Sequence, residues 1–125
     1  MREHAQNYHR ERKGNCAQSV AHAWMEKHTD SRDLLTAFSG CGGGRAPEGL
    51  CGALHASCTL AGPSAAKEIK ERFAEQTGNH QTCREIRRAG VLSCNECVAV
   101  AAELLDKHAD RPVQDQQDEA QALPE

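Results

Sequence analysis

The stretch SCNECVAVAAELLDKHA, residues 93–109, decides how the rest of the chain is interpreted. Ser93 is followed three residues later by Glu96, which is the pattern of a capping box at the start of a helix. The apolar residues Cys97, Val98 and Leu105 then recur at helical spacing, so one face of this helix is expected to be buried. The stretch therefore predicts a core helix that begins with two cysteines three residues apart.

Working outward, the remaining sequence also predicts helices, because no segment shows a sustained alternation of apolar and polar residues. The expected helices cover residues 2–12, 16–28, 31–38, about 50–61, 63–76 and 82–90, and residues 39–49 form a glycine-rich loop. We predict an all-α, single-domain compact bundle of six or seven short helices over residues 1–112. Residues 113–125 are polar and are predicted to be a disordered tail.

The composition limits the possible function. The chain has 125 residues, a formal net charge of -3, 3% aromatic residues and seven cysteines. The basic run at 9–13 is interrupted by Glu11, so no nucleic-acid partner is expected. A polar N-terminal segment and the absence of an apolar run of about 20 residues predict no membrane partner and a cytoplasmic location. The predicted core is small, so formation of a homodimer or binding of a metal would add to its stability.

Four of the cysteines fall at predicted helix starts. The capping residues Asn15, Thr82 and Ser93 directly precede Cys16, Cys83 and Cys94, and Cys51 follows the glycine loop. A helix start presents free N–H groups and partial positive charge, which stabilise a thiolate. Because a thiolate is both a nucleophile and a metal ligand, these four residues are the candidate site residues, provided that the fold brings the helix starts together.

The other three cysteines have different settings. Cys58 and Cys97 lie on apolar helix faces and are expected to be buried structural thiols. Cys41 lies in the glycine loop and is a candidate extra ligand or reactive thiol. His55 follows Cys51 by one turn, so it is a second candidate extra ligand. The remaining histidines are expected at the surface or in loops.

The cysteine segments resemble the redox-active protein family named for its C…GCAxxG…C…C cysteine pattern. The resemblance covers about residues 10–108 and is carried by GNCAQSV, by FSGCGGGRAPEGLCGALHAS, by TCREI and by CNECVAVAAELL. It aligns the four family cysteines with Cys16, Cys51, Cys83 and Cys94. Two features depart from the pattern: Ala56 replaces the late glycine, and three cysteines are additional.

A related domain in split-Soret cytochromes is similar to an iron–sulfur module, so the resemblance implies redox chemistry and a [2Fe–2S] or [4Fe–4S] cluster held by these four cysteines. The cluster would serve electron transfer or redox sensing with a redox partner protein that the sequence does not identify. Two alternatives stay open. One is a metal-free thiol–disulfide oxidoreductase that uses Cys94 and Cys97 as the redox pair, or Cys51 with another cysteine. The other is a structural zinc module that mediates an interaction.

Overall fold

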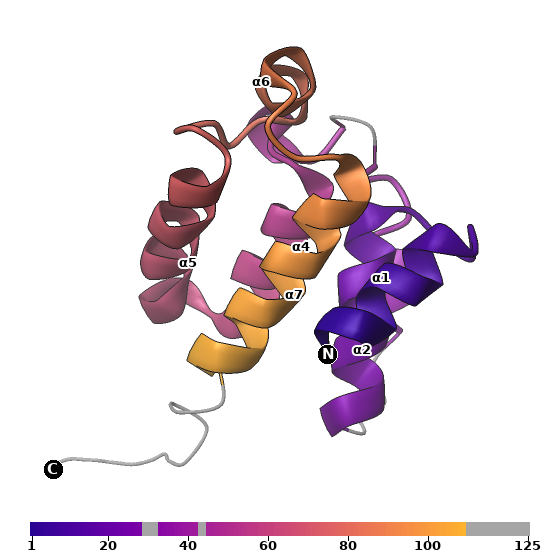
Figure 1. The fold of residues 1–125 in the computed structure, drawn as a ribbon. Coiled ribbons are helices and arrows are strands. Elements are labelled where there is room, and N and C mark those ends of the chain that lie inside the picture. The colour runs from indigo at the N-terminus through magenta and orange to yellow at the C-terminus, as the bar shows by residue number, and fades with distance from the viewer. Residues whose placement is uncertain (29–32, 43–44, 110–125) are drawn as a thin grey trace, which may run out of the picture.

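Helix α7 (Cys94–Ala109) is the central element of the computed structural model, which describes residues 1–28, 33–42 and 45–109. It packs against α1 (Arg2–Arg10), α2 (Cys16–His28), α4 (Gly52–Ala61) and α5 (Pro63–Gln76), as Figure 1 shows. The described residues form seven α-helices and no strand, so the all-α prediction is confirmed.

The smaller elements lie outside this packed group. They are α3 (Leu34–Ala37), the 3-10 turn η1 (Pro47–Gly49) and α6 (Cys83–Ala89). Helix α6 lies at one end of the bundle, above the start of α7 in Figure 1, and makes few contacts with the other helices. The predicted tail, residues 113–125, falls outside the described part of the chain.

The core is built mainly from aliphatic side chains, with Trp24, Phe38 and Phe73 as its aromatic members. Helix α5 contributes Ile69 and Phe73, which are fully buried against Leu54 of α4 and Leu105 of α7 in one apolar cluster. Burial of a side chain of this size stabilises the fold by about 1.5–3 kcal/mol. Between these large residues, α4 and α7 present many buried alanines, which let the helices approach closely.

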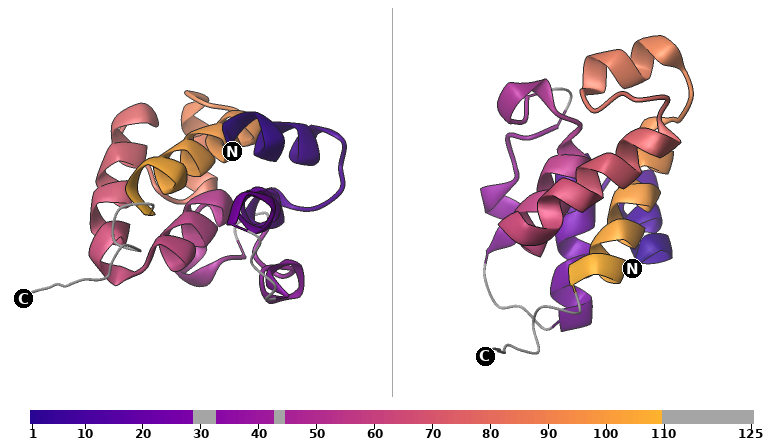
Figure 2. Two further views of the ribbon diagram at one scale, coloured as in Figure 1. Left: turned by 90° about the horizontal axis from the view of Figure 1, so that it is seen from below. Right: turned by 90° about the vertical axis from the view of Figure 1, so that its left-hand side faces the viewer.

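Helix direction brings the cysteine-bearing starts to the same end. The connection from α4 to α5 turns at Gly62, which has a φ of 95°, and Pro63 opens α5 in its first turn. In Figures 1 and 2, α2, α4 and α7 all begin near α6 and run toward the other end of the bundle, whereas α1 and α5 run back. None of the described helices has the length and apolar character that crossing a lipid bilayer requires.

Helix boundaries differ slightly from the predicted ones. The first helix ends at Arg10, and Arg12 then adopts a left-handed conformation with a φ of 60°. Helix α4 begins at Gly52, with Cys51 as its N-cap. Of the helix expected over 31–38, the structure describes α3 within it, and residues 31–32 lie outside the described part.

Candidate functional site: a cavity lined by five cysteines

The structure brings the four predicted cysteines together. One small cavity, of about 30 Å³, is lined by Cys16, Cys51, Cys83, Cys94 and Cys97, together with Gly52, Ile86, Arg87 and Leu92. We call it the cysteine cavity. Its lining comes from four helix starts far apart in the sequence, and apart from Arg87 the other lining residues carry no charge. Cys97, which we expected to be a structural thiol, is the fifth sulfur of this lining.

Local sequence explains how three of the thiols are held in place. The main-chain N–H of Gln18 donates to Asn15 Oδ1 at 2.7 Å, and Gln18 Oε1 accepts from the Asn15 N–H at 2.9 Å. Ser93 and Glu96 form the same reciprocal pair at 3.1 and 2.8 Å. These contacts confirm both capping boxes and place Cys16 and Cys94 at the first helical position.

The third capped start is that of α6. Thr82 Oγ1 accepts from the Glu85 N–H at 3.2 Å, so Cys83 also opens its helix. The Cys51 N–H donates to the Gln81 carbonyl at 2.9 Å, and Leu50 and Thr82 form an isolated antiparallel bridge. These main-chain contacts tie the start of α4 to the start of α6, which places Cys51 and Cys83 in the lining of the same cavity.

Gly52 permits this arrangement because it has no side chain. A Cβ at position 52 would lie 2.3 Å from the Cys41 carbonyl oxygen and 2.6 Å from Cys16 Sγ. Both distances are far below normal contact, and the oxygen belongs to the main chain, so it cannot rotate away. The glycine of the CGAL segment is therefore required for Cys16 to approach α4.

The thiols interact in two pairs across elements. The Cys94 thiol donates a hydrogen bond to the Cys16 sulfur, and this bond, helped by the N–H groups of Ala53 and Ala17, lowers the pKa of Cys16 to about 6 although burial opposes the shift. The same bond holds the proton on Cys94 and, with burial and the nearby thiols, raises the pKa of Cys94. One negative charge is thus favoured on the pair, located on the buried Cys16.

The second pair joins Cys51 and Cys97. A hydrogen bond to Cys97 raises the pKa of Cys51, and burial raises it further. Cys83 is half-buried, and burial raises its pKa as well, while the nearby Arg87 opposes that rise. The interactions therefore pair Cys94 with Cys16 and Cys51 with Cys97, rather than Cys94 with its helix neighbour Cys97.

His9 is a site residue that the sequence did not indicate. Its Nε2 lies 3.6 Å from Cys94 Sγ, and its Nδ1 lies 3.1 Å from Asn95 Nδ2. The Asn95 amide is oriented by Gln6, whose Nε2 donates to Asn95 Oδ1 and whose carbonyl accepts from Asn95 Nδ2, both at 3.0 Å. Asn95 therefore donates to Nδ1, and the neutral imidazole must carry its proton on Nε2, directed at the Cys94 sulfur.

Burial lowers the pKa of His9, in keeping with a neutral ring. The only signal in the sequence is that His9 occurs near the end of a helix, and many surface histidines share this property. The contact with Cys94 depends on how α1 packs against α7, which periodicity does not specify.

The remaining candidates lie away from the cavity lining. Cys58 is half-buried and its Sγ lies 3.7 Å from the Ala66 carbonyl oxygen; burial raises its pKa to about 11. Cys41 contributes its carbonyl oxygen beside Gly52, but its side chain is not part of the cavity lining. His55 packs edge-on against Phe38, with the ring centroids 5.8 Å apart.

Two further observations describe the chemical state of the site. All seven cysteines are free thiols. Within the described residues, no three or more His, Cys, Asp or Glu side chains are arranged to hold one metal ion. The sulfurs share a cavity, but no three of them surround one point as the ligands of a single ion would.

Comparison with known proteins adds no assignment. No protein-family model, no curated protein and no solved structure matches this chain. The functional argument therefore depends on the cysteine cavity itself.

Proposed function

We propose that the protein is a redox protein whose cysteine cavity binds an iron–sulfur cluster through Cys16, Cys51, Cys83 and Cys94, for electron transfer or redox sensing. The observation that carries the proposal is that five thiols from four helix starts line one cavity. Thiolates are the ligands that iron–sulfur clusters require. A reducing compartment such as the cytoplasm would keep these thiols available.

The surroundings of the cavity suit a negatively charged group. Helices α2, α4 and α7 have 13, 10 and 16 residues, and each directs its N-terminal end toward the sulfurs. The partial positive charge and free N–H groups of these ends stabilise anions. Arg87 adds a full positive charge beside Cys83.

The size of the cavity sets a condition on the proposal. A volume of about 30 Å³ holds only a water molecule or two. Cluster binding therefore requires the lining to open, and α6 is the element suited to this movement because it makes few contacts with the other helices. An outward shift of Ile86 and Arg87 would widen the cavity, while Cys83 would stay beside Cys51 because main-chain contacts tie the starts of α6 and α4 together.

Each residue then has a definite role. A bound iron–sulfur cluster would accept and release single electrons. Cys16, Cys51 and Cys94 would hold it from the bundle, and Cys83 would be the ligand from α6. Cys94 is the exposed ligand, and its sulfur receives the N–H of His9, so His9 is a positioning residue for Cys94.

A second candidate function follows from the thiol pairing. Exposed Cys94 and buried Cys16 share one proton, as an active dithiol does. In that function, Cys94 passes its proton to Cys16 and attacks a substrate disulfide, which releases the first substrate sulfur as a thiolate. That thiolate takes the proton from Cys16, and the Cys16 thiolate then attacks the Cys94 sulfur of the mixed disulfide. The second substrate sulfur leaves as a thiolate that water protonates, and a Cys16–Cys94 disulfide remains. The contact pattern favours this pair over Cys94 and Cys97.

A structural zinc site is the third alternative, and the sulfur arrangement argues against it. No three ligands in the described residues are placed around one ion, whereas cluster ligands lie further apart than zinc ligands do. A homodimer would enlarge the small core under any of these functions. Dimerisation stays a prediction here.

Anaerobic purification separates the candidates. We expect a coloured protein containing iron and labile sulfide, and we expect the colour to be lost on oxidation by air or on chelation. A colourless protein with one zinc ion per chain would contradict the proposal in favour of the zinc module. A metal-free protein in which oxidation links Cys16 to Cys94, identified by peptide mapping, would replace it with the dithiol function.

A further inference from the structure

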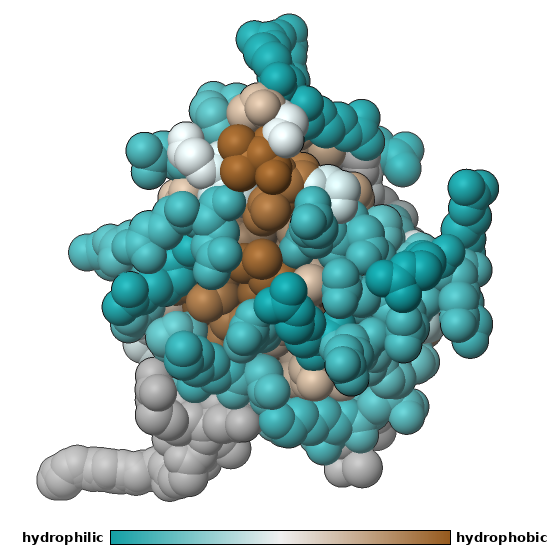
Figure 3. Space-filling model, in the orientation of Figure 1, coloured by the Kyte–Doolittle hydropathy of each residue, from teal (hydrophilic) through white to brown (hydrophobic). Residues whose placement is uncertain are grey.

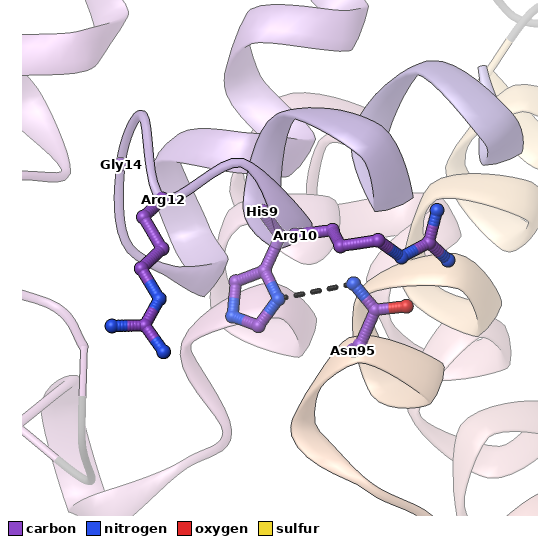
Figure 4. Close-up of a pocket in the computed structure, with 5 residues that line it drawn as sticks. All are labelled: His9, Arg10, Arg12, Gly14 and Asn95. Atoms are coloured by element: carbon purple, nitrogen blue, oxygen red, sulfur yellow. Dashed lines mark hydrogen bonds between the residues drawn. The ribbon is translucent and has the colours of Figure 1, made fainter.

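A basic surface pocket lies directly beside the exposed edge of the cysteine cavity. It has a volume of about 490 Å³ and is lined by His9, Arg10, Arg12, Gly14 and Asn95. Figure 4 shows His9 at its centre, in contact with Asn95. We call it the basic pocket. No acidic side chain is among its lining residues.

The pocket is connected to the thiols through His9. The ring forms part of the pocket wall, and its Nε2 lies 3.6 Å from Cys94 Sγ. Asn95, which also lines the pocket, directly follows Cys94 at the start of α7. A molecule seated in this pocket is therefore separated from the exposed sulfur by a single imidazole ring.

The positive charges of the pocket are available for binding. Arg12 has a left-handed backbone conformation, with a φ of 60°. No acidic side chain in the described part of the chain forms an ion pair with its guanidinium group. Arg10 donates one hydrogen bond, to Asn7 Oδ1 at 2.9 Å, and a guanidinium has five N–H donors. Glu11, which lies between the two arginines in the sequence, is paired with Lys13 at 3.2 Å.

We propose that the basic pocket is the docking surface for the acidic surface of a redox partner protein, which places that partner against His9 and Cys94. This inference rests on the proposed function only in that the partner exchanges electrons with the cysteine site. Figure 4 shows the two guanidinium groups on opposite sides of His9, directed away from one another. This divergence suits several carboxylates spread over a surface better than one small anion.

Positive charge gathered at one place on the surface steers an acidic partner toward that face and raises the association rate.

The test uses a hexaglutamate peptide carrying an uncharged fluorophore as the probe. Fluorescence anisotropy measures its binding to the full-length protein at low ionic strength. We expect binding that weakens as salt is added, because exposed charges are screened. The variant Arg10→Gln/Arg12→Gln should bind the peptide at least about fivefold more weakly than the wild-type protein does, since each lost contact removes part of the attraction.

The matched control is Lys67→Gln/Arg72→Gln on α5, which removes the same charge from a helix separated from α1 by α4 and α7 (Figure 1). It should leave peptide binding unchanged within about twofold. Equal weakening in both variants, or no binding by the wild-type protein, would overturn the docking proposal.

This binding assay does not depend on a bound iron–sulfur cluster, so its result is independent of the test of the proposed function. A protein that binds the peptide at the basic pocket but contains no iron retains the docking surface and loses the iron–sulfur assignment. A protein that contains iron and sulfide but does not bind the peptide retains the assignment and loses the docking surface.

Discussion

The two ends of α4 carry the same residue type in different surroundings. Cys51 caps the start of the helix and lines the cysteine cavity with four other thiols, whereas Cys58, near the other end, has the Ala66 carbonyl oxygen as its hydrogen-bond partner. One helix therefore places one cysteine among other thiols and a second, seven residues later, outside their cavity. The difference teaches that position relative to a helix start, where several helices converge, decides which neighbours a cysteine meets.

The sharpest test of this comparison exchanges each thiol for a hydroxyl. Cys51→Ser should abolish retention of iron and sulfide, because serine is a poor ligand for these clusters and Cys51 is a proposed ligand. Cys58→Ser should retain both, since its thiol lies outside the cavity lining. The measurement is iron and sulfide content after anaerobic purification, and circular dichroism checks the fold. Equal loss in the two variants would remove the distinction between the ends of α4.

Cys97 sharpens the same comparison. Our sequence interpretation made Cys97 a structural thiol, and the structure places it in the cavity as the partner of Cys51. With four ligands assigned elsewhere, Cys97→Ala should retain iron and sulfide and lower stability by about 1–2 kcal/mol, the cost of a small cavity in the core. Chemical denaturation measures that cost. Loss of the metal in Cys97→Ala would make it a ligand in place of one of the four.

Alkylation of the metal-free protein tests the two settings through pH. The pKa of Cys16 is lowered to about 6 by its hydrogen bond from Cys94, and burial raises that of Cys58 to about 11. At about pH 7.5 the Cys16–Cys94 pair carries a thiolate and Cys58 does not, so the pair should react with iodoacetamide roughly a hundredfold faster. Peptide mapping of the alkylated sites measures both rates. Similar rates at the two sites would contradict the charge distribution.

The alkylation rates of the Cys16–Cys94 pair and of Cys58 should also depend differently on pH. Reaction of the pair should level off above about pH 6–7, once the first of its two protons is lost and Cys16 is a thiolate, whereas reaction of Cys58 should still be rising above pH 9. A pair whose rate rises only at alkaline pH would show that Cys94 does not share its proton with Cys16.

Gly52→Ala tests the close approach at the start of α4. The added methyl group would meet the Cys41 carbonyl oxygen and Cys16 Sγ, so the start of α4 must shift. We expect a loss of about 1–3 kcal/mol in the free energy of unfolding, together with weakened metal retention. The control is Gly40→Ala, where a Cβ meets nothing within 4 Å. Urea denaturation of both variants distinguishes crowding at position 52 from a general effect of replacing glycine.

The smallest expected effect is on the cap of α7. Ser93→Ala removes the hydroxyl that accepts from the Glu96 N–H and should cost about 1 kcal/mol of stability. Ser64→Ala, at an exposed position in the first turn of α5, should change stability by less than about 0.5 kcal/mol. If the two variants lose the same stability in urea denaturation, the capping box does not stabilise the cysteine-bearing end.

Local sequence determined much of this protein. The helical spacing of apolar residues predicted the helices, and the capping patterns at Asn15, Thr82 and Ser93 located three cysteines at first helical positions, as the structure has them. These features could be predicted because a cap and an amphipathic face involve residues only three or four positions apart.

Tertiary structure decided which thiols meet and what lies beside them. The pairing of Cys16 with Cys94, the inclusion of Cys97, the contact of His9 with Cys94 and the need for glycine at position 52 all join residues from different helices. They depend on the direction and separation of packed helices, which are set by the fit of whole helix faces. A short sequence window carries no information about that fit, so only the folded arrangement could show a shared cavity and the basic pocket next to it.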